Sequence, residues 1–125
     1  MTKQILAGRK SRKMTMAVSV AALAIAAYAA PQTGVMTDSR DGKTYKTVKI
    51  GSQTWMAENL NYETEHSYCY NNEVHSCKKY GRFYEWEAAL RACPDGWHLP
   101  TKAEFEKLFD AVGGHKKAGK MLKST

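Results

Sequence analysis

The sequence predicts a small α+β domain in which antiparallel β-hairpins are followed by two helices. Apolar and polar residues alternate between turn signals from about residue 35 to residue 56, whereas apolar residues at helical spacing begin near residue 81 and again near residue 101. Aromatic residues make up 10% of the 125-residue chain, and disordered sequences are poor in them. The length limits the chain to one packed domain after an N-terminal segment.

The N-terminal segment has the order of features of a secretory signal peptide. Basic residues precede an apolar run at 14–26, and Ala27 and Ala29 supply the small residues that signal peptidase reads. We therefore expect residues 1–29 to be a signal peptide cleaved between Ala29 and Ala30, and the protein to be secreted or held at the cell surface. An uncleaved anchor is disfavoured because a spanning helix needs roughly 20 strongly apolar residues, so membrane contact is expected only through an uncleaved segment.

The charge of the expected mature chain argues against a nucleic-acid partner. The formal net charge of +7 includes five basic residues of the N-terminal segment, and without them 14 Lys and Arg face 12 Asp and Glu. These charges are interspersed, so the sequence offers no basic stripe that would neutralise a run of phosphates. Nucleic acid is therefore not an expected partner.

Three extended segments are predicted after the expected cleavage site. Residues 30–34 are interpreted as a short linker, and Val35–Asp38 as the first strand. A turn at 40–42 leads into the hairpin 44–56, whose two-residue turn at 51–52 begins with the glycine that such turns need. The pattern predicts a three-stranded antiparallel unit.

Two helices are predicted in the second half of the chain. The first, 81–92, carries apolar residues at i, i+3, i+6 and i+7, which we expect to form its buried face: Phe83, Trp86, Ala89 and Leu90. The second, 101–112, begins with a capping box of Thr101 and Glu104 and ends at the glycines 113–114.

The tetrad Trp-His-Leu-Pro before the second helix raises the question of a catalytic histidine. A catalytic histidine needs a nucleophile or a carboxylate partner, and the spacing places none beside His98. We therefore interpret this stretch as the corner from which the helix starts, and we expect no catalytic residue in the chain.

The three cysteines are the most chemically distinctive residues. With His66 and His75, the residues Cys69 and Cys77 have a spacing that could hold zinc. In an oxidising compartment a disulfide between Cys69 and Cys77, closing a hairpin across a polar turn, is favoured over a metal site. Cys93 is then an unpaired thiol, which indicates an intermolecular bond, a reactive thiol or a missing partner.

Four colinear blocks of the chain resemble a known family. They are DSRDGKTYKTVKIGSQTWMAENLNYE, SYCYNNEVHSCKKYGRFYEW, CPDGWHLPTKAEFEKLFDAVGG and AGKMLKST. Together they are similar to the Fibrobacter succinogenes major paralogous domain, a family of secreted or surface-attached bacterial proteins. The resemblance identifies residues 35–125 as the N-terminal part of such a domain.

The resemblance has implications for fold and completeness. It implies a C-type lectin-like fold, shared with the formylglycine-generating enzyme group, in which the two predicted helices flank a mixed sheet. It also implies that the second half of the domain is missing, together with a late cysteine that would be the partner of Cys93. We therefore expect residues 30–125 alone to be poorly folded, because apolar faces would stay exposed.

The sequence favours a secreted or cell-surface, non-catalytic binding module. The expected role is carbohydrate binding or surface adhesion, with a glycan or a cell-surface protein as partner, and with no cofactor and no metal. This role rests on fold analogy. Two alternatives are a truncated fragment with no independent activity, and a remote enzyme of the formylglycine-generating type, which would need a redox-active cysteine pair.

Overall fold

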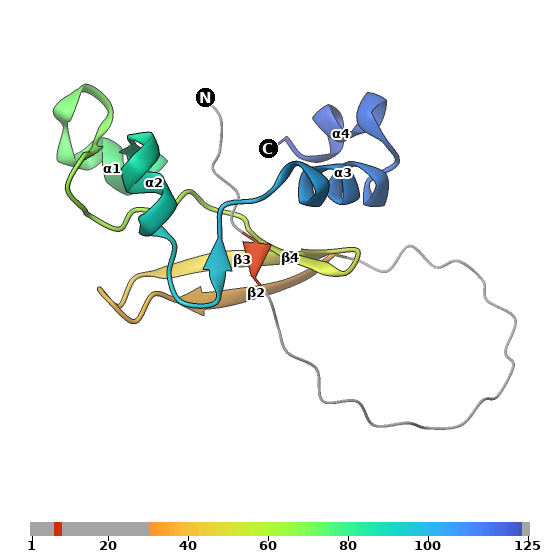
Figure 1. Cartoon of the computed structure of the whole chain (residues 1–125), viewed down its shortest axis with the longest axis horizontal. Coiled ribbons are helices and arrows are strands. Elements are labelled where there is room, and N and C mark those ends of the chain that lie inside the picture. The colour runs from red at the N-terminus through yellow and green to blue at the C-terminus, as the bar shows by residue number, and fades with distance from the viewer. Residues whose placement is uncertain (1–6, 9–30, 124–125) are drawn as a thin grey trace, which may run out of the picture.

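The computed structural model describes residues 7–8 and 31–123, and it shows a five-stranded antiparallel sheet (Figure 1). The strand order is β2-β3-β4-β1-β7. The strands are β1 (Ala7–Gly8), β2 (Gln32–Thr37), β3 (Thr44–Ile50), β4 (Gln53–Met56) and β7 (Trp97–His98). β2, β3 and β4 form the predicted antiparallel unit, although β2 begins inside the segment interpreted as a linker, 30–34.

A second, two-stranded sheet and the helices complete the described part of the chain. β5 (Ser67–Tyr68) pairs with β6 (Phe83–Tyr84). The helices are the 3₁₀-helix η1 (Tyr70–Asn72), α1 (Val74–Tyr80), α2 (Trp86–Ala92), α3 (Lys102–Ala111) and α4 (His115–Met121). In Figure 1, α1 and α2 lie toward one end of β2–β4, and α3 and α4 toward the other. The α+β class is confirmed, and the C-type lectin-like assignment stays a prediction.

The register of β3 and β4 shows which side chains point to each of the two faces of the sheet. Val48 lies opposite Trp55, and Thr47 lies opposite Met56. Since side chains alternate along a strand, Trp55 and Met56 point to opposite faces. Trp55 packs with Leu108 of α3, whereas Met56 packs in a cluster with Ala92 of α2. The sheet is therefore covered by α3 on one face and by α2 on the other.

The predicted helix 81–92 is wrong in its start, and of the four residues predicted for its buried face only Ala89 is buried. Phe83 belongs to β6, and the helix α2 begins only at Trp86. Trp86 is 69% exposed and Leu90 is 51% exposed, so neither is a core residue. The buried residues of α2 are the alanines Ala88, Ala89 and Ala92. The helix therefore buries only small side chains, and its large apolar ones are left outside.

The second predicted helix is confirmed together with its capping box. The Thr101 side chain accepts from the Glu104 backbone N–H, and the Glu104 carboxylate accepts from the Thr101 N–H at 2.8 Å. At the other end, Gly113 has a φ of 96°, which favours glycine, and the Gly114 N–H donates to the Phe109 carbonyl at 2.7 Å.

The predicted signal segment 1–29 lies outside the described residues except for β1. Ala7 pairs with Trp55 of β4 and with His98 of β7, and Gly8 makes the neighbouring pairs. Removal of residues 1–29 would therefore take β1 from between β4 and β7. Within the part of the chain that the structure describes, no helix has the length and apolar character needed to cross a bilayer.

A buried ion pair joins the β2–β3 turn to α2. The Asp38 side chain is fully buried and accepts from Arg40 at 2.6 and 2.8 Å. Arg40 also donates to the Ala92 carbonyl at 2.8 Å, and its guanidinium lies 3.7 Å from the centroid of the Tyr62 ring. The hydrogen bonds from Arg40 lower the pKa of Asp38. Asp38 therefore stabilises the fold at neutral pH, and this contribution is lost as the pH falls through the lowered pKa.

Replacing Arg40 with alanine should destabilise the chain by about 3 kcal/mol, because it leaves the buried Asp38 carboxylate without a charged partner and with only the backbone N–H of residue 40 as a donor. Denaturant unfolding followed by tryptophan fluorescence measures the change. The matched control is Lys43→Ala, which removes the more exposed ion pair with Asp41 and a hydrogen bond to the Asn61 carbonyl, and should cost about 1 kcal/mol. Equal effects of the two substitutions would show that the buried pair has no special role.

Candidate functional site

Three exposed aromatic side chains gather on the smaller sheet and on the 3₁₀-helix η1 beside it. We call Tyr68, Tyr70 and Phe83 the aromatic surface; they are 45%, 43% and 48% exposed. Tyr68 of β5 lies opposite Phe83 of β6, so both side chains emerge on the same face. The ring centroids of Tyr70 and Phe83 are 6.4 Å apart. Exposed rings gathered in this way mark an interaction surface more often than scattered apolar residues do.

Hydrogen-bonding groups lie at the edge of the aromatic surface. The Tyr68 hydroxyl donates to Glu85 Oε1 at 2.8 Å, and this hydrogen bond raises the pKa of Tyr68. His66 Nδ1 lies 3.5 Å from Glu85 Oε2. The side chains of His66 and Glu85 are 56% and 58% exposed, so both can reach a bound molecule. The surface therefore offers apolar rings and polar groups side by side.

A disulfide fixes the backbone beside the aromatic surface. Cys69 precedes η1, Cys77 lies within α1, and the two sulfurs are bonded. The predicted Cys69–Cys77 disulfide is confirmed, but it joins a loop to a helix and does not close a hairpin. Between the cysteines, Asn71 and Asn72 have φ values of 53° and 56°, a left-handed conformation that asparagine tolerates better than most residues. Tyr70 is therefore held in a short, cross-linked loop.

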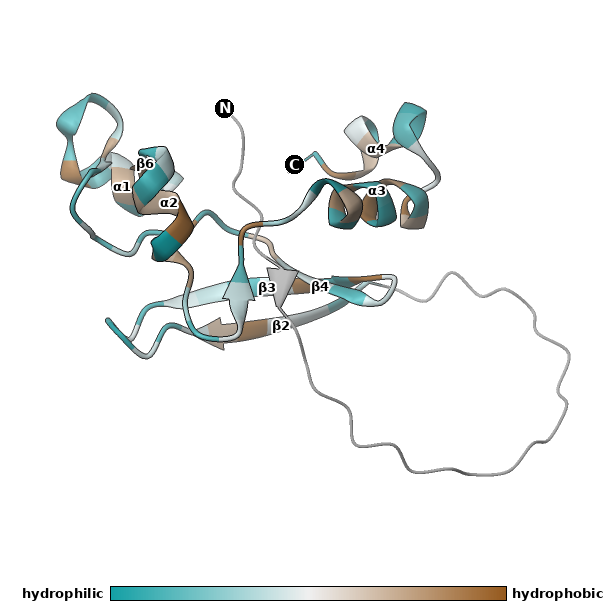
Figure 2. Ribbon diagram, viewed as in Figure 1, coloured by the Kyte–Doolittle hydropathy of each residue, from teal (hydrophilic) through white to brown (hydrophobic). Residues whose placement is uncertain are grey.

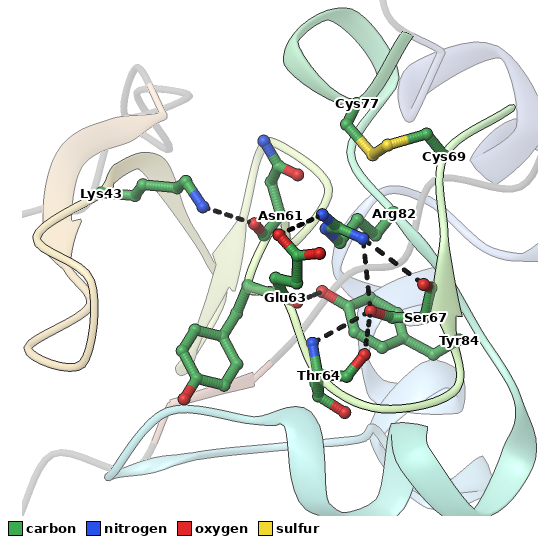
Figure 3. Close-up of a disulfide and its surroundings, with 10 residues drawn as sticks. Lys43, Asn61, Glu63, Thr64, Ser67, Cys69, Cys77, Arg82 and Tyr84 are labelled. Atoms are coloured by element: carbon green, nitrogen blue, oxygen red, sulfur yellow. Dashed lines mark hydrogen bonds and ion pairs between the residues drawn. A yellow bond between two sulfur atoms is a disulfide. The ribbon is translucent and has the colours of Figure 1, made fainter. Parts of the chain in front are cut away.

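Arg82 lies directly before β6 and anchors the smaller sheet (Figure 3). Its side chain is only 12% exposed, and Nη2 lies 2.7 Å from Glu63 Oε2. Nη1 donates to the carbonyl and to the hydroxyl of Ser67, both at 3.4 Å. Two residues further along the chain, the Tyr84 hydroxyl donates to the Tyr62 carbonyl at 2.6 Å, and burial raises the pKa of Tyr84. These bonds hold β5 and β6 to the segment that follows β4.

A polar cavity of 550 Å³ lies between the C-terminal end of α1 and the β2–β3 turn. Asn59 donates from Nδ2 to the Tyr80 carbonyl at 2.6 Å, while its buried Oδ1 has no hydrogen-bond partner within the described structure. Lys43 Nζ donates to the Asn61 carbonyl at 2.8 Å. Gly81 is required here, because its φ is 74° and an added Cβ would lie 2.5 Å from Asn59 Cβ. The cavity is a second place where polar ligand groups could bind.

The cysteine and histidine residues do not assemble a metal site. Cys69 and Cys77 are bonded to each other, so neither offers a thiolate to zinc. His66 and His75 lie beside carboxylates, with His75 Nε2 at 3.3 Å from Glu73 Oε2. Among residues 7–8 and 31–123, no group of three or more His, Cys, Asp or Glu side chains has an arrangement that could hold a metal ion.

Cys93 is a free thiol next to the buried ion pair. It is partly buried, and it packs against the α2-side core. Burial raises the pKa of the Cys93 thiol, so the reactive thiolate is disfavoured at neutral pH.

His98 has a carboxylate partner that the sequence spacing did not indicate. His98 Nε2 lies 2.7 Å from Glu104 Oε1, because β7 runs beside the start of α3. Hydrogen bonds from Thr101 and His98 lower the pKa of Glu104. Because Glu104 also accepts from the Thr101 N–H in the capping box, the contact between His98 and Glu104 adds to the cap of α3. The available sequence signal was the capping box itself, whose Glu104 lies six residues after the histidine.

Comparison with known proteins gives one family match. The family model described as the Fibrobacter succinogenes major domain matches residues 48–125. No curated protein and no solved structure matches the chain. The matched range includes the aromatic surface, the disulfide and the polar cavity's α1 side.

Removing the disulfide with Cys69→Ala and Cys77→Ala together should destabilise the chain by roughly 2–3 kcal/mol, because a short loop gains freedom in the unfolded state. Cys93→Ala is the control and should cost about 1 kcal/mol at most. Urea unfolding of both variants checks the difference. Peptide mapping without reductant should show Cys69 linked to Cys77 and a titratable Cys93. Three titratable thiols with bound zinc would contradict this assignment.

Proposed function

The chain belongs to the Fibrobacter succinogenes major domain family, and on that premise we propose that it is a secreted or cell-surface, non-catalytic module that binds carbohydrate. The observation that carries the proposal is the aromatic surface of Tyr68, Tyr70 and Phe83, with Glu85 and His66 at its edge. Sugar rings present apolar C–H faces and peripheral hydroxyls. Exposed aromatic rings bind the C–H faces, and carboxylate and imidazole groups bind the hydroxyls.

The rigidity of the surface supports a binding role. Tyr70 lies in the loop closed by the Cys69–Cys77 disulfide, and Phe83 is next to Arg82, whose guanidinium is held by Glu63 and Ser67. A surface that is already ordered loses little conformational entropy when it binds a ligand. Tyr and Phe side chains also have few rotatable bonds, which keeps this cost low.

The chemistry of the ionisable groups supports a non-catalytic module. The partner of His98 is committed to capping α3, and the raised pKa of Cys93 disfavours a nucleophilic thiolate. An enzyme of the formylglycine-generating type needs a pair of redox-active cysteines at a cleft, whereas Cys69 and Cys77 cross-link a short loop.

The proposed location is outside the cytoplasm. A disulfide persists in oxidising compartments, and the chain carries one in its described part. The basic and apolar pattern of residues 1–29 supports export, with cleavage between Ala29 and Ala30. A C-type lectin-like fold, implied by family resemblance, is part of the same proposal.

A glycan array probed with the full, oxidised chain should show retention of a defined set of polysaccharides. With the best ligand, calorimetry should show that Tyr68→Ala and Phe83→Ala each raise Kd roughly tenfold, which corresponds to about 1.4 kcal/mol of lost stacking. The control is Val35→Ala, which changes an exposed apolar side chain on β2.

A second variant separates the two candidate sites. Tyr80 lines the polar cavity and lies outside the aromatic surface. Loss of binding in Tyr80→Ala alone would move the site to the polar cavity. Absence of retention on any glycan, with the folded state verified by near-ultraviolet circular dichroism, would contradict the proposed function.

A further inference from the structure

A large apolar cavity lies on the α3 side of the main sheet, away from both candidate sites described above. Its volume is 710 Å³, within the range of about 300–1,000 Å³ that small-molecule sites occupy. Its apolar lining comes from β3, β4, α3 and the end of α4: Val48, Ile50, Trp55, Leu108, Val112 and Leu122. Trp55 and Leu108 are only 1% exposed, so the inner wall is fixed core.

The charged residues of the lining are all basic. Among the described residues, Lys49, Lys117 and Lys123 line the cavity, and no Asp or Glu does. Since Lys49 alternates with Val48 and Ile50 along β3, its side chain points to the other face, and the charge at the cavity comes from Lys117 and Lys123. From residue 111 to residue 123 the chain contains four lysines and no acidic residue. Figure 2 shows hydrophobic residues along α3 and a predominantly hydrophilic α4.

One buried polar atom also lacks a partner at this cavity. Trp55 lines the cavity, and its indole Nε1 is buried without a hydrogen-bond acceptor in the described structure. A buried N–H without an acceptor is unfavourable, but Trp55 is only 1% exposed, so this N–H does not select the head group of a ligand. The head group is selected by the basic residues of the lining.

We propose that this cavity binds a single acyl chain with an anionic head group, such as a long-chain carboxylate. The acyl chain occupies the apolar space between the sheet and α3, and the head group lies near Lys117 and Lys123. Apolar volume, basic charge and the absence of lining carboxylates are complementary to that one class of ligand. The proposal does not rest on carbohydrate binding, since the two sites share no residue.

The test uses the full oxidised chain and 11-(dansylamino)undecanoic acid as the probe. The dansyl emission should rise on binding, with energy transfer from tryptophan because Trp55 lines the cavity. Dodecanoate should displace the probe at least tenfold better than dodecyltrimethylammonium, which has the same chain and the opposite charge. Combined Lys117→Ala and Lys123→Ala should weaken dodecanoate at least fivefold and leave dodecanol unchanged.

The matched control is Lys102→Ala with Lys107→Ala, two exposed lysines of α3 that do not line the cavity. This variant should bind dodecanoate as the unsubstituted chain does. Ala111→Phe, which fills the cavity from its rim, should weaken the binding of dodecanoate and of dodecanol together.

Absence of probe emission would overturn the proposal, and so would equal displacement of the probe by the cationic amphiphile. Binding to anionic vesicles without binding of monomeric dodecanoate would instead assign the face to a lipid surface. A dimer that excludes the probe would assign it to a second copy.

Discussion

The buried pair of Asp38 and Arg40 is the contact on which the arrangement of the described chain depends. It joins three segments that are distant in sequence, because Asp38 closes the β2–β3 turn, Arg40 binds the last carbonyls of α2, and its guanidinium stacks on Tyr62. Charge in a protein interior is stable only when it is fully paired. The Asp38 carboxylate therefore has its charged partner only when the sheet, α2 and the segment after β4 are arranged in this way.

From that junction the chain builds two surfaces of different chemistry. On the α2 side, three contacts hold the backbone around Tyr68, Tyr70 and Phe83 in place. They are the Tyr62–Tyr84 hydrogen bond, the ion pair of Arg82 and the disulfide. On the α3 side, Trp55 and Leu108 form a core that leaves an apolar space beside the basic α4. The proposed carbohydrate site thus lies on the smaller sheet and the proposed acyl-chain site on the main sheet, and each depends on a different set of contacts.

Local signals in the sequence predicted the elements whose geometry is local. The glycine turn between β3 and β4, the capping box of α3 and the Cys69–Cys77 disulfide each depend on residues close together in the chain. The failures came from tertiary context. Trp86 and Leu90 have helical spacing, yet alanines form the buried face of α2, because tertiary contacts decide which face of the helix turns inward. The aromatic surface requires the pairing of β5 with β6, and the partner of His98 requires β7 beside α3, and neither is visible in spacing.

Hydrogen–deuterium exchange of the full chain carrying Arg40→Ala tests most directly whether the buried pair holds these parts together. If the account is right, amides of α2 and of residues 57–66 exchange much faster than in the unsubstituted chain, while those of α3 change little, because α3 packs on the other face of the sheet. Equal acceleration in α3 and α2, or no acceleration in either, would contradict it.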